Sequence, residues 1–273
     1  MDTEQLRFLP LKDAPLAVFD TETTGVDPNE ARIVEFGVVY RNHVIEGDYV
    51  NRFLFNPDVP DESWREAQEV CGWNEDEMNV IHNSLKFRES GHRIHDALSG
   101  MVVAGYNIFD YDIPAIHAEE RRAGLPETQF PLVIDVLVIV REFLRGQRER
   151  SLPKISAHLG YTFHAHRAVD DCRAVLHILG HAVYKGWLDA TVGEVCDQIA
   201  KWKAQQDADW ALYSYWLYHD RLVCGEPLMM GAGKECGMPL SAVPTRKLDW
   251  YLGSDIEFPK AVRDAFLVEL NRR

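Results

Sequence analysis

The sequence predicts an α/β fold in which a mixed β-sheet is covered by helices. Three apolar segments near the N-terminus, residues 16–20, 33–40 and 49–55, have the length and composition of consecutive strands. After them, apolar segments alternate with amphipathic segments as far as residue 185. Consecutive strands followed by strands that alternate with helices indicate a sheet with both antiparallel and parallel neighbours.

Turn residues separate the predicted elements in the first half of the chain. The first strand is bounded by Pro15 and Gly25, and Asn56-Pro57 ends the third strand. Charged residues mixed with scattered apolar positions predict short helices over residues 61–99. The elements expected next are a strand at 101–105, a helix at 110–123 before Gly124, a strand at 132–136 and a helix ending near Gly146.

Two further helices complete the predicted first domain, and a change in composition marks its end. Ser151-Leu-Pro-Lys opens a short helix that stops at Gly160, because serine caps helices and proline fits their first turn. A long helix follows over residues 168–185. Aromatic residues are concentrated at 202–218, where a helical packing stripe is favoured over base stacking. We therefore expect domains at residues 1–188 and 189–273, the second small and mainly helical, with a final amphipathic helix at 255–270.

Composition narrows the class of protein. The 273 residues are 46% hydrophobic, as in a globular protein, but contain no apolar run of 18 residues and no secretory signal. The lack of such an apolar run predicts that no segment spans a membrane. The five cysteines form no CxxC pair, which is typical of reduced thiols and predicts a cytoplasmic protein. The net charge of −14 argues against tight non-specific DNA binding. Local basic patches can nevertheless occur on a protein that is acidic overall.

Asp20 and Glu22 stand two residues apart at the end of the first predicted strand. Side chains alternate along a strand, so both carboxylates lie on one side of the sheet with Thr21 opposite. Adjacent buried anions are unfavourable without a cation or proton between them, and Mg²⁺ or Mn²⁺ prefers such oxygen ligands. The alternative is a solvated strand end entering a turn.

Two later segments carry similar chemistry. Gly105-Tyr-Asn-Ile-Phe-Asp110 joins a strand to a helix, where Asp110 is either a site residue or a first-turn residue favoured by the helix dipole. In His166-Arg-Ala-Val-Asp-Asp171, Asp171 borders the apolar face of the long helix, so it is a better candidate than Asp170 to point inward.

These three segments, in this order, resemble the DEDDh family of 3′→5′ exonucleases, which includes the epsilon proofreading subunit and exonuclease X. The resemblance covers residues 15–185 and implies a ribonuclease H-like sheet with four converging carboxylates that bind two Mg²⁺ ions, for which Mn²⁺ may substitute. It implies the metal ligands Asp20, Glu22, Asp110 and Asp171. His166 is implied as the general base, whereas His164, at the wrong spacing, is expected to be a loop residue.

The resemblance also implies a substrate site and a function. The expected substrate contacts are Thr23, Thr24, Gly25, Asn107 and Phe109; for the first three the alternative is a simple turn. A basic run, Arg141, Arg145, Arg148, Arg150 and Lys154, is either a phosphate-tracking surface or a solvated helix and loop. We expect release of nucleoside monophosphates from single-stranded or frayed DNA 3′ ends.

The alternatives are an exoribonuclease, for which a 2′-hydroxyl contact would be diagnostic, and a non-catalytic or proofreading module that binds a polymerase or repair protein. Residues 233–252 resemble the small module that trails the nuclease domain in exonuclease X-type proteins, and we expect this module to contact nucleic acid or a partner. Gly231-Ala-Gly-Lys234 lacks the spacing of a phosphate-binding P-loop.

Overall fold

A computed structural model describes two compact units, Met1–Ala200 and Lys201–Arg273. The described residues are 2–41, 49–144, 147, 149–188, 190–219, 228–230, 232, 234–236, 238–254, 256 and 258–272. Helix α10 (Val192–Trp216) belongs to both units, and the boundary expected between residues 188 and 189 precedes it. None of the helices in these ranges is both long and apolar enough to cross a membrane.

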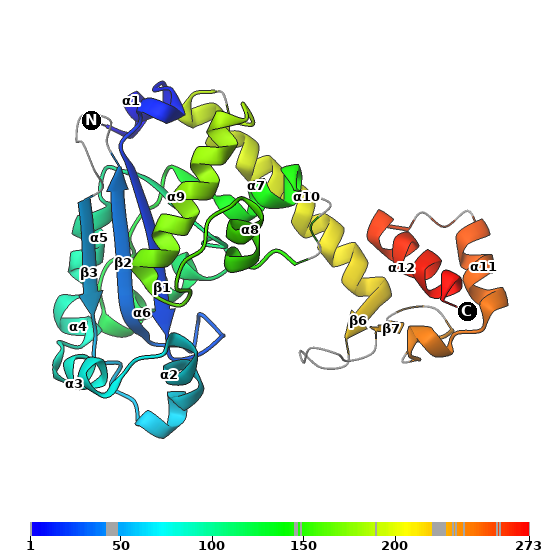
Figure 1. Cartoon of the computed structure of the whole chain (residues 1–273), viewed down its shortest axis with the longest axis horizontal. Coiled ribbons are helices and arrows are strands. Elements are labelled where there is room, and N and C mark those ends of the chain that lie inside the picture. The colour runs from blue at the N-terminus through cyan, green and yellow to red at the C-terminus, as the bar shows by residue number, and fades with distance from the viewer. Residues whose placement is uncertain are drawn as a thin grey trace. The chain divides into compact units, whose positions relative to one another are not determined.

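A five-stranded mixed sheet forms the centre of the first unit (Figure 1). Its spatial order is β3-β2-β1-β4-β5. The β1–β2 and β2–β3 pairs are antiparallel, whereas β4 is parallel to both β1 and β5. The strands are β1 (Leu16–Thr23), β2 (Ile33–Arg41), β3 (Tyr49–Leu54), β4 (Val102–Gly105) and β5 (Val133–Asp135). The mixed α/β sheet predicted from the sequence is therefore confirmed.

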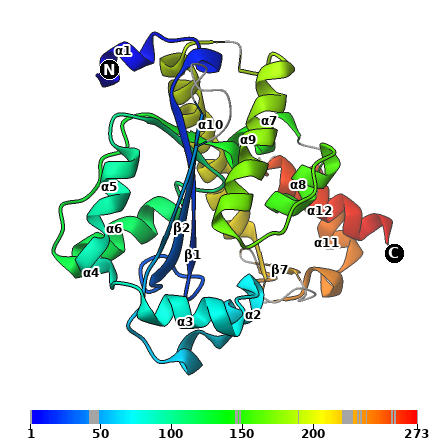
Figure 2. The same ribbon diagram turned by 60° about the vertical axis from the view of Figure 1, so that its left-hand side comes forward.

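Helices cover both faces of this sheet (Figure 2). On one face, α4 (Phe87–Ser90), α5 (His92–Leu98) and α6 (Asp112–Ala123) enclose a core that contains Phe19 and Phe36. On the other, α9 (Ala168–Tyr184) packs on β1 and β2, with α7 (Val136–Phe143) and α8 (Leu152–His158) beside it. The remaining helices are α1 (Thr3–Arg7), α2 (Arg65–Cys71) and α3 (Glu75–Asn83).

The packing of α9 depends on a glycine. Gly37 of β2 lies opposite Asp20 of β1 in the sheet register. A Cβ atom at Gly37 would lie 2.8 Å from the backbone carbon of Ala168 and the nitrogen of Val169. The first turn of α9 therefore rests directly on the strand backbone, which a larger residue would prevent. This close approach brings Asp171, in the same turn, to the end of β1.

The second unit has a core of its own. It contains a two-stranded sheet of β6 (Leu217–His219) and β7 (Leu228–Met230), followed by α11 (Thr245–Gly253) and α12 (Lys260–Asn271). Tyr251 and Phe266 are buried in its centre, with ring centroids 5.6 Å apart. The unit is mainly helical, as expected, although its last helix begins at Lys260 rather than near residue 255.

Candidate active site

Strand β1 carries two of the predicted carboxylates to a shared position. Asp20 and Glu22 project from the face of β1 that α9 covers, while Thr21 projects to the opposite face. One oxygen each from Asp20, Glu22 and Asp171 lie within 4.8 Å of one another, close enough to share a metal ion. The sequence thus identified three side chains that the fold brings together from β1 and α9.

Asp171 is held in place by the backbone before its helix. The Arg167 amide donates a hydrogen bond of 2.9 Å to Asp171 Oδ2. Because this bond spans the first turn of α9, it fixes both the orientation of the Asp171 carboxylate and the backbone of Arg167, the residue before the helix. Asp171 is buried, whereas Asp170 is less buried and pairs with Arg173 at 2.8 Å.

The structure does not bring Asp110 to this group, and Asp112 takes the place expected for it. Asp110 is exposed and precedes α6, and its charge acts on Asp135. Asp112 is only 3% exposed, and its charge acts on both Asp20 and Glu22. Its Oδ1 accepts hydrogen bonds from the Thr21 amide (2.9 Å) and hydroxyl (2.6 Å).

A periodicity in the sequence distinguishes these two aspartates. Asp112, Ala115, Ile116 and Glu119 are all buried and stand at positions i, i+3, i+4 and i+7 of α6. Asp112 therefore begins the inward stripe of the helix. Sequence reasoning placed the start of the helix at Asp110 and missed this signal.

Burial raises the pKa of all four carboxyl groups, and the charges of neighbouring carboxylates raise it further. Burial, followed by the charge of Asp171, raises the pKa of Glu22 to about 8 even though Cys71 donates a hydrogen bond to it. Burial raises the pKa of Asp112 and of Asp171 to about 7 each. For Asp20, burial and then the charge of Asp112 raise the pKa well above its usual range. Carboxyl groups with such raised pKa values hold protons near neutral pH. Divalent cations, which prefer oxygen ligands, can replace these protons and neutralise the same charges.

The cavity at this group has a volume of about 780 Å³, within the range of small-ligand sites. Asp20, Glu22 and Asp171 lie on its acidic side, and α2 supplies an apolar side with Ala67 and Val70. Cys71 lies between the two sides, its thiol 3.3 Å from Glu22 Oε2. The cavity therefore offers separate surfaces to a charged group and an apolar group of one ligand.

His166 stands at the rim of the same cavity. It is exposed, and its backbone has a φ of 63°, a left-handed conformation that is uncommon for residues other than glycine. Non-glycine residues in this region often occur at functional sites. His164 is also exposed, but it does not line this cavity.

The loop after β1 forms another part of the cavity wall. Thr23, Thr24 and Gly25, the expected substrate contacts of this loop, all line it. The Thr23 hydroxyl donates to the Gly25 carbonyl at 2.8 Å, and the Tyr111 hydroxyl bonds to both groups. Tyr111 was not identified from the sequence, and it fixes the shape of this loop.

Asn107 and Phe109, the other expected substrate contacts, do not line this cavity. Their amides donate to the carboxylate of the buried Asp135, at 2.9 and 3.3 Å, and Phe109 packs against the core. Tyr106 and Tyr111 line the cavity instead. The two predicted residues thus shape the turn between β4 and α6, whereas their neighbours face the ligand space.

The predicted basic run is described only in part. Arg145 and Arg148 lie outside the described residues. Arg141 and Arg150 are partly buried, and the exposed Lys154 pairs with Glu149 at 3.4 Å. The Arg150 carbonyl accepts a 2.5 Å hydrogen bond from Tyr106, which joins the run to the cavity wall.

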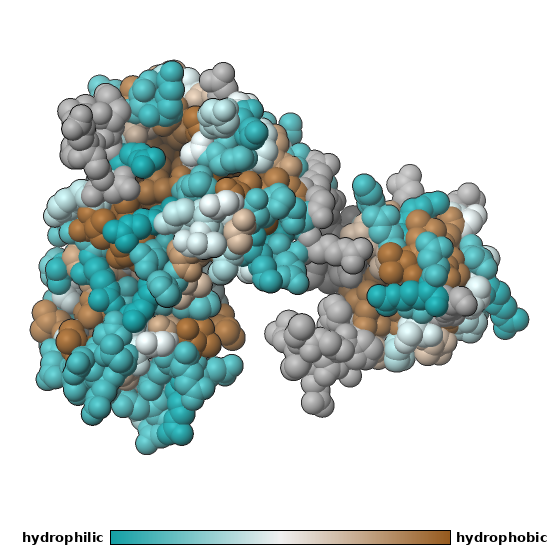
Figure 3. Space-filling view, in the orientation of Figure 1, coloured by the Kyte–Doolittle hydropathy of each residue, from teal (hydrophilic) through white to brown (hydrophobic). Residues whose placement is uncertain are grey.

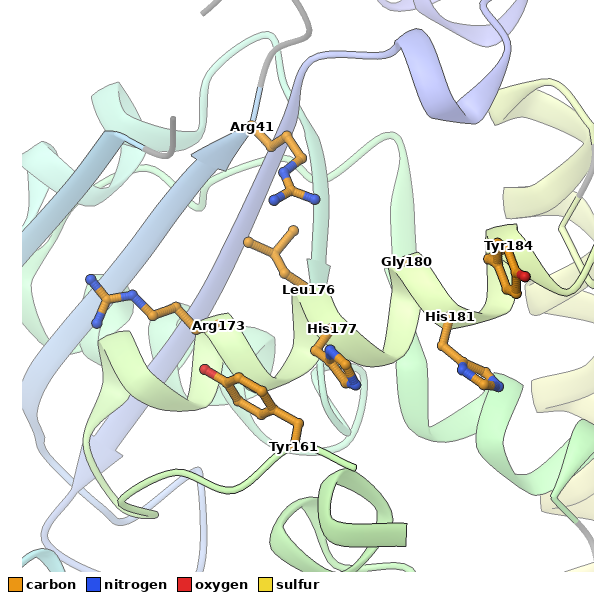
Figure 4. A pocket seen from close by; sticks show the side chains of 8 residues that line it. All are labelled: Arg41, Tyr161, Arg173, Leu176, His177, Gly180, His181 and Tyr184. Atoms are coloured by element: carbon orange, nitrogen blue, oxygen red, sulfur yellow. The ribbon is translucent and has the colours of Figure 1, made fainter. Parts of the chain in front are cut away.

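A second cavity, of about 500 Å³, lies on the outer side of α9 (Figure 4). Arg41, Arg173, His177 and His181 line it, and Tyr161 stacks on His177 with centroids 4.9 Å apart. In Figure 4 these side chains point to different sides of the helix rather than toward one centre. None of the four carboxylates lines this cavity.

Comparison with known proteins identifies relatives of the first unit. Residues 17–179 match a family model, RNase_T, described as Exonuclease. Protein NEN4 of Arabidopsis thaliana is 26% identical over 113 residues, which are 41% of this chain and 44% of that protein. DNA polymerase III PolC-type of Halalkalibacterium halodurans is 26% identical over 178 residues, 64% of this chain and 12% of that protein. This chain therefore spans less than half of either relative.

Solved structures of exonuclease I share the fold. One, whose study concerns how processivity is achieved, superposes with a TM-score of 0.53 at 17% identity, covering 74% of this chain and 44% of that one. E. coli exonuclease I in complex with a dT13 oligonucleotide superposes with a TM-score of 0.52, also at 17% identity and with the same coverage. These similarities confirm the ribonuclease H-like fold expected from the sequence.

Proposed function

The chain belongs to the DEDDh exonuclease family, and from this premise we propose that it is a metal-dependent 3′→5′ exonuclease that releases nucleoside monophosphates from DNA 3′ ends. The observation that carries the proposal is the group of four acidic side chains at the end of β1. Three of them have oxygens within 4.8 Å of one another, and the charge of Asp112 acts on two of these three.

These carboxylates suit two divalent cations. Asp20, Glu22, Asp112 and Asp171 would hold them, with Asp112 in place of the Asp110 expected from the sequence. Four negative charges balance two divalent ions, which explains why burial of so many acids is tolerated. When bound, such ions neutralise charge at the scissile phosphodiester and lower the pKa of the attacking water. Mg²⁺ is the expected ion, and Mn²⁺ has the same preference for oxygen ligands.

The remaining residues of the cavity have distinct roles in this reaction. His166, at the rim, accepts the proton of the water that attacks the terminal phosphodiester. The loop formed by Thr23, Thr24 and Gly25 contacts the terminal nucleotide, and Tyr111 keeps that loop in shape. The apolar side of α2 excludes water from the sugar and base.

The distribution of charge supports binding of a nucleic acid strand despite the net charge of −14. Residues 136–188 contain eight basic and four acidic side chains, so this segment is positive. Residues 58–77, by contrast, contain eight acidic and one basic side chain, and the surface over α2 and α3 is mostly hydrophilic (Figure 3). A polyanion is therefore attracted to the α7–α9 side of the cavity and repelled from the α2–α3 side.

Matched 5′-labelled DNA and RNA oligonucleotides test this proposal. With Mg²⁺ or Mn²⁺ we expect a ladder of products shortened one nucleotide at a time from the 3′ end of DNA, and no products with EDTA. Asp20→Asn is the inactive control. Immediate release of the labelled 5′ nucleotide would contradict the proposed polarity, and a ladder from RNA alone would replace the DNA assignment with an exoribonuclease.

A further inference from the structure

The residue that follows His166 is held at two points. Its backbone amide donates to Asp171 Oδ2, and its guanidinium reaches α3, ninety residues away in sequence. There, Arg167 Nη1 and Nη2 lie 2.5 and 3.0 Å from Glu77 Oε1 and Oε2. Paired, parallel hydrogen bonds of this kind define direction as well as distance.

Glu77 is itself held rigidly. It is the third residue of α3 and forms a capping box with Asn74: the Asn74 amide donates to Glu77 Oε2 at 3.0 Å, and the Glu77 amide donates to Asn74 Oδ1 at 2.9 Å. The carboxylate that receives Arg167 is therefore fixed to the start of a helix. The Glu77 and Arg167 side chains are only 25% and 29% exposed, so solvent screens their attraction less than that of a surface pair.

A second ion pair lies beside the Arg167–Glu77 pair, and the charges of the two pairs act on one another. Glu35, buried beside Glu22 in the sheet register, is occupied by Arg52 through hydrogen bonds of 2.9 and 2.8 Å. The charges of Arg52 and Arg167 act on each other. Glu35 already accepts two hydrogen bonds from Arg52, and Arg167 makes its own paired hydrogen bonds with Glu77 of α3.

We propose that the Glu77–Arg167 ion pair positions His166 for the hydrolytic reaction, so that Glu77 acts on catalysis through the histidine without touching substrate. This inference rests on the proposed function. His166 has a left-handed backbone and an exposed side chain, so its direction depends on how the chain is held on either side. Arg167 holds the chain on one side, with the Asp171 carboxylate fixing its backbone and α3 fixing its side chain.

Kinetics of the 273-residue chain with labelled DNA and Mn²⁺ test the effect on catalysis. Glu77→Gln retains the capping box, because glutamine also accepts from the cap amide, but removes the charge that holds Arg167. We expect kcat to fall about tenfold, as for loss of a supporting residue around a catalytic group, with KM unchanged. Glu75→Gln, an exposed position in the same helix turn, is the matched control and should leave kcat unchanged.

The His166→Ala background separates positioning from a general effect on folding. If Glu77 acts through His166, adding Glu77→Gln to His166→Ala changes kcat no further. An equal loss of kcat in both backgrounds, or no loss in the single variant, overturns the proposal. Should Glu77→Gln fail to fold, Arg167→Lys, which keeps the charge but loses the two-pronged geometry, is expected to lower kcat in the same direction.

A readout independent of activity distinguishes this inference from the proposed function. In ¹⁵N-histidine-labelled protein, the imidazole signal assigned by its loss in His166→Ala should shift or broaden in Glu77→Gln but not in Glu75→Gln. An unchanged signal overturns the positioning role. A changed signal in a protein that releases no nucleotides would support the positioning role and reject the exonuclease.

Discussion

Asparagine at position 112 should make the metal-free protein more stable while removing its activity. Burial raises the pKa of Asp112 from the usual 3.8 to about 7. Each pKa unit corresponds to about 1.4 kcal/mol, so an ionisable carboxyl at this position destabilises the metal-free fold by about 4 kcal/mol at pH 8. Asparagine avoids this cost and still accepts the two hydrogen bonds from Thr21 at its Oδ1 atom.

The pH dependence follows from the direction of the shift. The folded pKa is higher than the unfolded one, so the penalty is absent below about pH 4, grows as the pH rises and is complete above about pH 7. In EDTA, the melting temperature of Asp112→Asn should therefore exceed that of the wild type by up to roughly 10 °C at pH 8 and by less than half of that difference at pH 5. With Mn²⁺ the order should reverse, because only the wild type has the full set of ligands.

Asp110→Asn is the matched control for this experiment. Asp110 is exposed and lies outside the acidic group, so its replacement should alter neither the melting temperature in EDTA nor the rate of nucleotide release. Thermal melts in EDTA and Mn²⁺ are combined with the oligonucleotide assay. Loss of activity in Asp110→Asn with full activity in Asp112→Asn would refute the site as built from the structure.

Three further predictions address the helix packing, the histidine and the metal. Gly37→Ala should destabilise the fold by about 1–3 kcal/mol and lower activity, because the added methyl group would push the first turn of α9 away from β1. Gly180→Ala is the control: the added carbon meets no atom within 4 Å, so stability should rise by about 0.5–1 kcal/mol and activity should be retained. His166→Ala should lower kcat by about 10²–10⁴ while Mn²⁺ still raises the melting temperature, and loss of that stabilisation would show that the histidine supports the metal site instead. Calorimetric titration with Mn²⁺ should show proton release and an affinity that increases up to about pH 8, because Glu22, with a pKa of about 8, must lose its proton; a pH-independent affinity would contradict this.

The order and type of most elements were predictable from local patterns. Apolar runs ended by turn residues identified all five strands of the sheet, and a cap, a proline and a glycine delimited α8. The precise start of α6 was not predicted. The helix was expected to begin at Asp110, two residues too early, so Asp110 was identified as a site residue in place of Asp112. A carboxylate next to a helix start resembles a helix cap whether or not it faces the core.

Strand alternation and helical periodicity act over a few consecutive residues, and they indicated the mixed sheet and three of the four clustered carboxylates. The order of the three acidic motifs indicated the family by resemblance. Three features became visible only in the folded chain: Asp112 joins the cluster from the other face of the sheet, Gly37 allows α9 to approach, and Glu77 binds Arg167. These contacts join segments up to 131 residues apart, as between Gly37 and Ala168. Such pairs are selected by the packing of whole elements. The periodicity of α6 indicates that Asp112 points inward, but it does not specify which side chains Asp112 meets there.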